Sequence, residues 1–331
     1  MATRKYADAK VALVGAGLIG AGWAVHLLYH GQKNLILFDT QEASLTRAKE
    51  RISQGLQFFV DNGVLTAERK AELEAIPQYT LDIKEACGDA EFIIENAPET
   101  LTIKQQVIAN IEAVCRDDAI ISSSTSGIMV RYIAAKATHK ERIIGAHPYL
   151  PVYLLPLVEI VIDEDVQDKY LNKLTEFLKE VNKKPVVLKK DCPSYIGSRL
   201  MGAILRESMY MIENGVCDME DIDTAFCYGP GMRYGLMGPF HVYELTGGDA
   251  GIRGLFNGPI GNGQDRPQVE GPLSHPNEYG NVYPPAVGLY LREQTGPEMD
   301  RILASEGRTH KDLEEYRDKG LLELLKVHGL I

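Results

Sequence analysis

The fold is decided near the start of the chain, where Lys10–Val14 (KVALV) runs into Gly15–Gly20 (GAGLIG). The first segment is short and apolar, which predicts a buried strand, and the second fits the pattern GxGxxG. Helical spacing follows over residues 18–30, and Asn34–Phe38 (NLILF) predicts a second strand that stops at Asp39. A strand, a glycine turn, a helix and a second strand form the unit that binds dinucleotides.

The glycine turn and Asp39 have separate physical roles. The first glycine allows a tight turn, the second lets the backbone approach a pyrophosphate, and the third permits close packing of helix and strand. The positive end of the helix then faces the phosphates. A carboxylate at Asp39 accepts hydrogen bonds from the ribose hydroxyls and repels a 2′-phosphate, so we expect NAD rather than NADP. The expected cofactor contacts on the turn are Gly15, Gly17, Leu18, Ile19 and Gly20.

Predicted strands alternate with predicted helices up to about residue 190, which indicates an α/β fold of the Rossmann type with a doubly wound parallel sheet. Two helices, over residues 42–59 and 66–74, are predicted to form a helical hairpin inserted after the second strand, with Thr66 as an N-cap. The further predicted elements are helices over residues 103–114 and 166–181 and strands over residues 91–95, 119–122, 142–146, 157–162 and 185–188.

The pattern changes near Asp191, after which strands no longer alternate with helices. Residues 193–226 have helical spacing, with a new helix predicted to open at Asp221. We therefore predict two domains: residues 1–190 bind NAD, and residues 191–331 form an all-α domain for substrate binding and dimerisation.

Later in the chain, residues 258–285 are rich in Gly, Pro and Asn, which predicts an extended loop. Residues 286–331 are predicted to be mainly helical again.

Charge and composition disfavour several classes of function. The formal net charge of −11 argues against nucleic acid or an anionic membrane surface as a partner. No apolar run is long enough to span a bilayer. The five cysteines are scattered without a CxxC pair, so we expect neither a disulfide framework nor a metal site. The N-terminal residues lead directly into a strand pattern without a signal peptide, and we expect a cytoplasmic protein.

Four polar residues are predicted at or near strand ends, where ligands bind in a doubly wound sheet. Glu99, Ser126 and His147 each follow a predicted strand, and Glu159 lies inside the apolar stretch Leu157–Ile162. A carboxylate in an apolar strand is costly unless it is paired, and His147 is the candidate partner. Oxidation of an alcohol needs a base for the hydroxyl proton, and a neutral imidazole held by a carboxylate fits that role. The alternative interpretation is a structural histidine.

With these residues the chain resembles the 3-hydroxyacyl-CoA dehydrogenase superfamily over roughly residues 8–256. The resemblance rests on the GxGxxG turn, Asn96–Glu99 (NAPE), Ser124–Ser126 (STS) and the spacing from Ser126 to His147 and on to Glu159. Within the superfamily, the chain is similar to the group that contains L-carnitine dehydrogenase and lambda-crystallin (L-gulonate 3-dehydrogenase). The stretches that carry this closer similarity are residues 151–159, 221–223, 228–233 and 247–253.

The resemblance implies a role for each matching residue. Ser126 would bind the substrate oxygen, His147 would be the general base, and Glu159 would orient it. Glu99 and Lys104 would lie near the nicotinamide. The helical domain would close the site and form a homodimer.

Two positions depart from the family pattern. Leu150 stands where the family usually has Asn, and Ser198 stands where it has Asn or Asp. In the family both positions face the substrate region, so the resemblance implies that Ser198 is a catalytic candidate and Leu150 a substrate contact. A pocket without a partner for a substrate polar group rejects that substrate strongly, which argues against carnitine itself.

Arg233 and Arg253 are candidate anchors for a substrate carboxylate, since guanidinium binds oxyanions in bidentate fashion. The alternative interpretation is that these arginines lie at the surface or contact another domain without binding substrate.

The function predicted from the sequence is NAD-dependent oxidation of the hydroxyl of a 3-hydroxy acid by hydride transfer. The substrate can be carnitine-like, gulonate-like or a 3-hydroxyacyl compound, and a small molecule is the expected partner. Two alternatives remain open, a 3-hydroxyacyl-CoA dehydrogenase acting on a thioester and a non-catalytic NAD-binding protein of the same fold.

Overall fold

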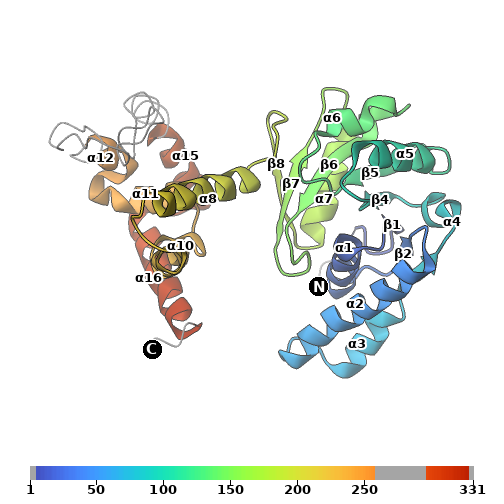
Figure 1. Cartoon of the computed structure of the whole chain (residues 1–331), viewed down its shortest axis with the longest axis horizontal. Coiled ribbons are helices and arrows are strands. Elements are labelled where there is room, and N and C mark those ends of the chain that lie inside the picture. Colours follow the sequence, from blue (N-terminus) through green and yellow to red (C-terminus); the bar gives the residue numbers. More distant parts are fainter. Residues whose placement is uncertain (1–4, 258–295, 328–331) are drawn as a thin grey trace. The chain divides into compact units, whose positions relative to one another are not determined.

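The computed structural model describes residues 5–257 and 296–327, which form two compact units, Met1–Met201 and Gly202–Ile331 (Figure 1). The loop predicted over residues 258–285 lies outside the described residues, as does the first part of the helical region predicted from residue 286. Among the described helices, none combines the length and apolar character needed to cross a membrane.

The first unit is built on an eight-stranded sheet with the order β3-β2-β1-β4-β5-β6-β7-β8. β1 lies between β2 and β4, so the strand order reverses beside it. This reversal leaves a crevice at the carboxyl end of β1, the usual ligand site of such sheets. The strands are β1 (Val11–Val14), β2 (Leu35–Phe38), β3 (Gln78–Thr80), β4 (Phe92–Glu95), β5 (Ile120–Ser123), β6 (Ile143–Pro148), β7 (Leu157–Val161) and β8 (Lys184–Val187).

The sheet is mostly parallel, but β6 and β7 pair in antiparallel fashion, and β8 runs parallel to β7. The prediction of a parallel sheet was therefore wrong for this edge. Only residues 149–156 connect β6 to β7, and a parallel return needs a longer crossover. The antiparallel register places His147 directly opposite Glu159. Opposite residues of an antiparallel pair project to the same face, so the fold brings these two side chains together.

The two faces of the sheet bury separate apolar clusters. Val11 and Leu13 contribute to one cluster, whereas Ala12 and Val14 contribute to the other, as the alternation of a strand requires. The first cluster includes residues of α1, α2 and α7, and the second includes residues of α4, α5 and α6. Helices therefore cover both faces. The helices of this unit are α1 (Leu18–Tyr29), α2 (Glu42–Asp61), α3 (Ala67–Glu74), α4 (Ile83–Cys87), α5 (Leu101–Glu112), α6 (Val130–Ile133) and α7 (Asp168–Glu180).

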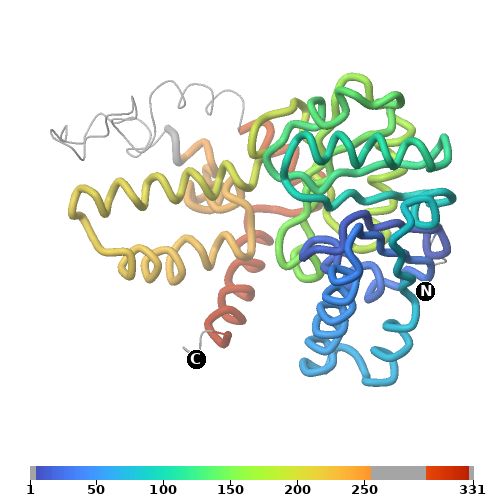
Figure 2. The backbone as a smooth tube through the Cα atoms, turned by 45° about the vertical axis from the view of Figure 1, so that its right-hand side comes forward, coloured from blue at the N-terminus to red at the C-terminus, as the bar shows by residue number. Residues whose placement is uncertain are grey.

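The predicted helical hairpin is present. α2 and α3 contact each other and lie side by side in the tube view (Figure 2). Thr66 caps α3, since its side chain accepts a hydrogen bond from the backbone N–H of Arg69 at 3.2 Å. β3 was not predicted, because this three-residue edge strand is only partly buried and lacks a clear apolar pattern.

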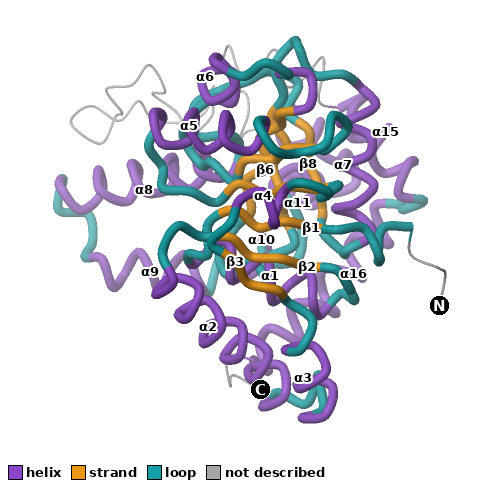
Figure 3. Tube along the Cα trace, turned by 90° about the vertical axis from the view of Figure 1, so that its right-hand side faces the viewer, coloured by secondary structure: helices purple, strands orange, loops and turns teal. Residues whose placement is uncertain are grey.

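The described part of the second unit is helical (Figure 3). The prediction that Asp221 opens a helix was wrong: Asp218 is the N-cap of α9, and Asp221 is the third helical residue of its capping box. Both residues are acidic and near the helix start, so composition alone did not separate them. The helices are α8 (Gly197–Glu213, which begins in the first unit), α9 (Met219–Cys227), α10 (Pro230–Tyr234), α11 (Pro239–Thr246), α12 (Gly251–Asn257), α15 (Gly296–Glu306) and α16 (His310–Val327).

Candidate functional site

The glycine turn lies between β1 and α1, at the point where the strand order reverses. Gly15 has φ +102°, and a Cβ there would lie 2.7 Å from the backbone oxygen of Asn96. A Cβ at Gly20 would lie 2.0 Å from the backbone oxygen of Gly15, so only glycine permits this packing. A Cβ at Gly17 would have no described atom within 4 Å. The backbone at Gly17 is therefore open to a ligand.

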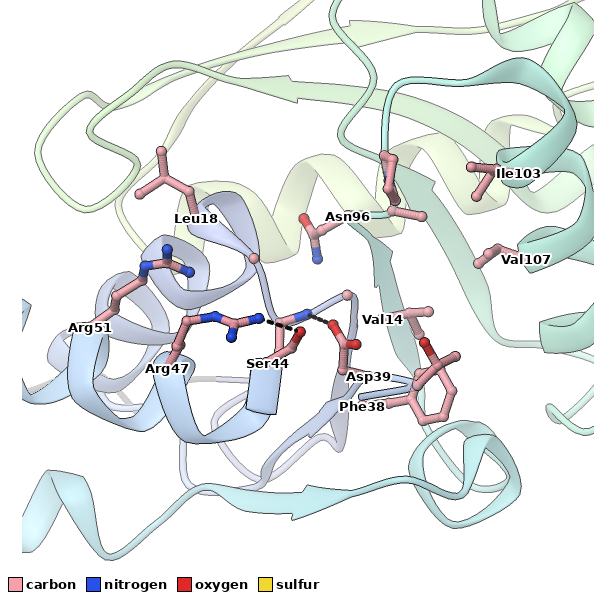
Figure 4. A pocket seen from close by; sticks show the side chains of 16 residues that line it. Val14, Leu18, Phe38, Asp39, Ser44, Arg47, Arg51, Asn96, Ile103 and Val107 are labelled. Carbon is pink, nitrogen blue, oxygen red and sulfur yellow. Dashed lines mark hydrogen bonds between the residues drawn. The ribbon is translucent and has the colours of Figure 1, made fainter. Parts of the chain in front are cut away.

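A cavity of about 590 Å³ extends from this turn to Asp39 (Figure 4). The Asp39 carboxylate accepts hydrogen bonds from the backbone N–H of Ala16 at 3.0 Å and of Gln41 at 3.1 Å. These bonds hold the carboxylate at the cavity wall, where it can accept the ribose hydroxyls of a dinucleotide. The open turn, the helix N-terminus and this carboxylate together fit NAD.

Arg47 and Arg51 also line this cavity, and the sequence analysis did not single them out. Arg47 donates a hydrogen bond to the Ser44 hydroxyl at 3.1 Å. Both arginines are on α2, four residues apart and therefore on one helix face. A pair of basic residues at this spacing just after Asp39 was the signal that could have found them.

A second cavity of about 540 Å³ shares residues Gly17, Leu18 and 96–98 with the first. Its lining contains nine of the predicted site residues, drawn from distant parts of the sequence. These residues are Gly17, Leu18, Ile19, Glu99, Lys104, Ser126, His147, Leu150 and Ser198. Two connected cavities of this kind match the two halves of a dinucleotide with a substrate pocket at one end.

His147 lines the second cavity, and the buried Glu159 contacts its ring. The Nδ1 atom of His147 lies 3.0 Å from Oε2 of Glu159, and the Glu159 side chain is only 1% exposed. Glu159 Oε1 accepts hydrogen bonds from the backbone N–H of Ile196 at 2.8 Å and of Gly197 at 3.0 Å, at the start of α8. The carboxylate is thus compensated by donors despite its burial. A proton on Nδ1 directed at the carboxylate leaves Nε2 as the basic nitrogen.

A second buried carboxylate, Glu95, organises the opposite wall. Lys104 Nζ lies 3.0 and 3.1 Å from the two Glu95 oxygens and 3.5 Å from Oε2 of Glu99. Glu95 and Lys104 are both almost fully buried, so their charges compensate each other. Lys104 also donates to the backbone oxygen of Ala97 at 3.1 Å, which fixes the loop after β4.

Glu99 fixes the loop that carries Ser126. Its Oε1 accepts hydrogen bonds from the backbone N–H of Ser126 at 3.0 Å and of Gly127 at 2.9 Å, and from the Thr125 hydroxyl at 2.7 Å. Burial acts to raise the pKa of Glu99, but these hydrogen bonds and the Lys104 charge outweigh burial, so its pKa lies below the usual value. Glu99 is therefore a carboxylate that holds Ser126 at the cavity wall.

The two predicted arginine anchors belong to the second unit. Arg253 forms a bidentate ion pair with Asp300, with distances of 3.1 and 2.7 Å. Arg233 donates to the backbone oxygen of Val242 at 3.3 Å and to the Thr246 hydroxyl at 3.0 Å. Their role as substrate anchors stays a prediction.

Two residues bonded to the second site, Glu95 and Tyr149, were not predicted from the sequence. The signal for Glu95 was available, since it ends the apolar stretch EFIIE just as Glu159 interrupts LVEIVI. Tyr149 gave no such signal, because only the antiparallel turn after β6 places its hydroxyl 3.2 Å from Glu159 Oε2.

Comparisons with known proteins show which family the chain matches. Residues 10–192 match the model of the 3-hydroxyacyl-CoA dehydrogenase NAD binding domain, and residues 195–270 match that of the C-terminal domain of the same family. An L-carnitine dehydrogenase of Bacillus cereus is 32% identical over 96% of this chain and 92% of its own length. An L-carnitine dehydrogenase of Mesorhizobium japonicum is 37% identical over 74% of this chain and 66% of its own length.

Solved structures show the same likeness. The structure of a 3-hydroxyacyl-CoA dehydrogenase from Archaeoglobus fulgidus has a TM-score of 0.69 and 25% identity, and the match covers 98% of this chain and 100% of that one. A 3-hydroxybutyryl-CoA dehydrogenase from Escherichia coli has a TM-score of 0.64 and 30% identity, covering 72% of this chain and 49% of that one.

Proposed function

This chain belongs to the 3-hydroxyacyl-CoA dehydrogenase family, and from that premise we propose that His147 is the general base in the oxidation of its 3-hydroxy substrate. The protein is an NAD-dependent dehydrogenase acting on CH–OH. The observation that supports the proposed base is the pair between His147 Nδ1 and the buried Glu159 carboxylate, at 3.0 Å.

The chemistry follows from the positions of the polar groups. NAD, when bound, supplies the acceptor for a hydride from the carbinol carbon. Nε2 of His147 takes the hydroxyl proton, and Glu159 stabilises the imidazolium that forms. Ser126 donates a hydrogen bond to the substrate oxygen, and Ser198 lies on the same cavity wall. Gly15, Gly17 and Asp39 hold the adenosine and pyrophosphate half of the cofactor, Gly20 allows the turn to pack closely, and Glu99 and Lys104 support the nicotinamide side.

We infer that the substrate is a small 3-hydroxy acid. Of the described residues that line the second cavity, the one cation is Lys104, and its ammonium group is committed to Glu95 and Glu99. Leu150 and Met201 add apolar surface. These features favour a compact substrate held by hydrogen bonds at its hydroxyl. Arg233 and Arg253 remain the candidates for its carboxylate. The named solved relatives keep a second candidate open, a 3-hydroxyacyl-CoA thioester.

A substrate panel separates these candidates. Purified protein is mixed with NAD and, in turn, L-carnitine, L-gulonate, 3-hydroxybutyrate or 3-hydroxybutyryl-CoA, and NADH formation is followed. We expect the highest kcat/KM with a free acid other than carnitine. A preference for the thioester would contradict the free-acid proposal. NAD binding without turnover of any 3-hydroxy compound would favour the non-catalytic alternative.

We also propose that the protein is a cytoplasmic homodimer. The described residues of α8 include none that is buried, and Leu200, Leu205 and Met209 expose large apolar side chains. Apolar helix surface of this kind is typical of subunit contacts. All five cysteines are free thiols, which favours a reducing compartment. Light scattering that gives the mass of one chain at micromolar concentration would contradict the dimer, and fractionation of the host cell tests the compartment.

A further inference from the structure

The hydroxyl of Tyr149 contacts the same carboxylate oxygen as the imidazole. Tyr149 Oη lies 3.2 Å from Glu159 Oε2, and His147 Nδ1 lies 3.0 Å from that oxygen. The rings of His147 and Tyr149 are 4.9 Å apart between centroids. Glu159 therefore receives two donors on Oε2 and two backbone donors on Oε1.

Several features hold the phenol in place. A Cβ at Gly197 would lie 2.0 Å from Tyr149 Oη, so the absence of a side chain at Gly197 makes room for the hydroxyl. Burial raises the pKa of Tyr149 despite an opposing hydrogen bond from Ser198, which keeps the phenol protonated and able to donate. Tyr149 also lines the second cavity beside His147 and Leu150.

We propose that Tyr149 is a positioning residue that sets the basicity of His147 by sharing the Glu159 carboxylate. This inference rests on the proposed role of His147. A donor on Oε2 withdraws negative charge from the atom that stabilises the imidazolium. Tyr149 therefore weakens the attraction between the Glu159 carboxylate and a protonated His147 ring. A weaker attraction favours the neutral imidazole, which is the form that accepts a proton.

The other titratable groups near the imidazole have partners of their own and do not depend on the Tyr149 hydroxyl. Tyr195, just before α8, has its ring 5.5 Å from that of His147, and its hydroxyl donates to the backbone oxygen of Ile128 at 3.2 Å. Glu99, after β4, and Lys104, on α5, line the same cavity, and Lys104 pairs with both Glu99 and Glu95. Removing one hydroxyl at Tyr149 leaves these groups intact.

The test compares Tyr149→Phe with wild type and with a matched control, Tyr153→Phe. Tyr153 is in the same β6–β7 connection, but its ring packs against Phe59 with a centroid distance of 5.8 Å. The pH dependence of kcat/KM for alcohol oxidation is measured with the best substrate from the panel. We expect the acid limb of Tyr149→Phe to move to higher pH by roughly half a unit or more, while the control superimposes on wild type.

A titration of the His147 imidazole by NMR gives the same quantity without turnover, with His147→Gln used to assign the signal. We expect the pKa of His147 to rise in Tyr149→Phe. An unshifted or downward-shifted pKa would overturn the inference, as would a uniform loss of activity with an unchanged pH profile. Failure of the proposed function is distinguishable, because His147→Gln would then retain turnover.

Discussion

Buried charge explains why particular residues stand in this site. Glu95 and Glu159 are 0% and 1% exposed, and each is compensated by specific donors rather than by solvent. Lys104 compensates the charge of Glu95. Glu159 is hydrogen-bonded to His147 and to the backbone N–H of Ile196 at the start of α8. A buried carboxylate without such donors would be strongly destabilising, so each one identifies its partners. A carboxylate inside an apolar strand therefore predicts the His147–Glu159 pair from sequence, whereas no sequence feature predicts that Tyr149 also contacts Glu159.

Two glycines of the turn provide a matched pair of substitutions. Gly17→Ala adds a methyl group into open space, so the melting temperature should stay within about a degree of that of wild type. The affinity for NAD should fall by roughly tenfold or more, because the methyl group occupies the place where the pyrophosphate approaches the backbone. Gly20→Ala forces a Cβ against the Gly15 backbone, and overpacking of this kind costs about 1–3 kcal/mol. Melting curves and NAD titration by calorimetry measure both effects. Equal loss of stability in the two variants would contradict this division of roles.

At the scale of elements, the antiparallel β6–β7 pair explains both what the sequence predicted and what it did not. The strands themselves were predicted, because each is a short apolar run. The apolar pattern does not give the relative direction of the two strands. That direction depends on the length of the connection between them. The short edge strand β3 and the start of α9 were missed or misplaced, since neither has a distinctive apolar pattern.

Helix α1 carries a buried histidine that should make stability depend on pH. His26 Nε2 lies 2.7 Å from the backbone oxygen of Val181, and burial, aided by the charge of Lys183, lowers the pKa of His26 to about 2. Below about pH 6.5, His26 therefore binds a proton in the unfolded chain but not in the folded chain. The stability is fully present above that pH and is lost as pH falls, by at most about 1.4 kcal/mol per pH unit.

The matched substitution is His26→Gln, whose amide can donate to Val181 without gaining charge. Between about pH 7 and pH 5, the free energy of unfolding should fall more steeply for wild type than for this variant. Denaturant titrations at several pH values measure the two slopes. Parallel slopes would show that His26 does not contribute to the acid sensitivity.

At the scale of the whole molecule, the first unit contains the cofactor turn, both cavities and the proposed base. The matching family models extend over both units, up to residue 270. The domain boundary predicted at residue 190 rests on the end of the alternation of strands and helices near Asp191 and stays a prediction. The sequence could not predict the contacts of Arg253, because its partner Asp300 is 47 residues away and no local pattern connects them.

The most direct test of the central claim is the turnover of His147→Ala under saturating NAD and substrate. A general base typically contributes a factor of about 10²–10⁴, so the rate of NADH formation should fall by that factor. The affinity for NAD should stay within about twofold of wild type, because the glycine turn and Asp39 are untouched. A variant that binds NAD normally and oxidises the substrate at close to the wild-type rate would contradict the account.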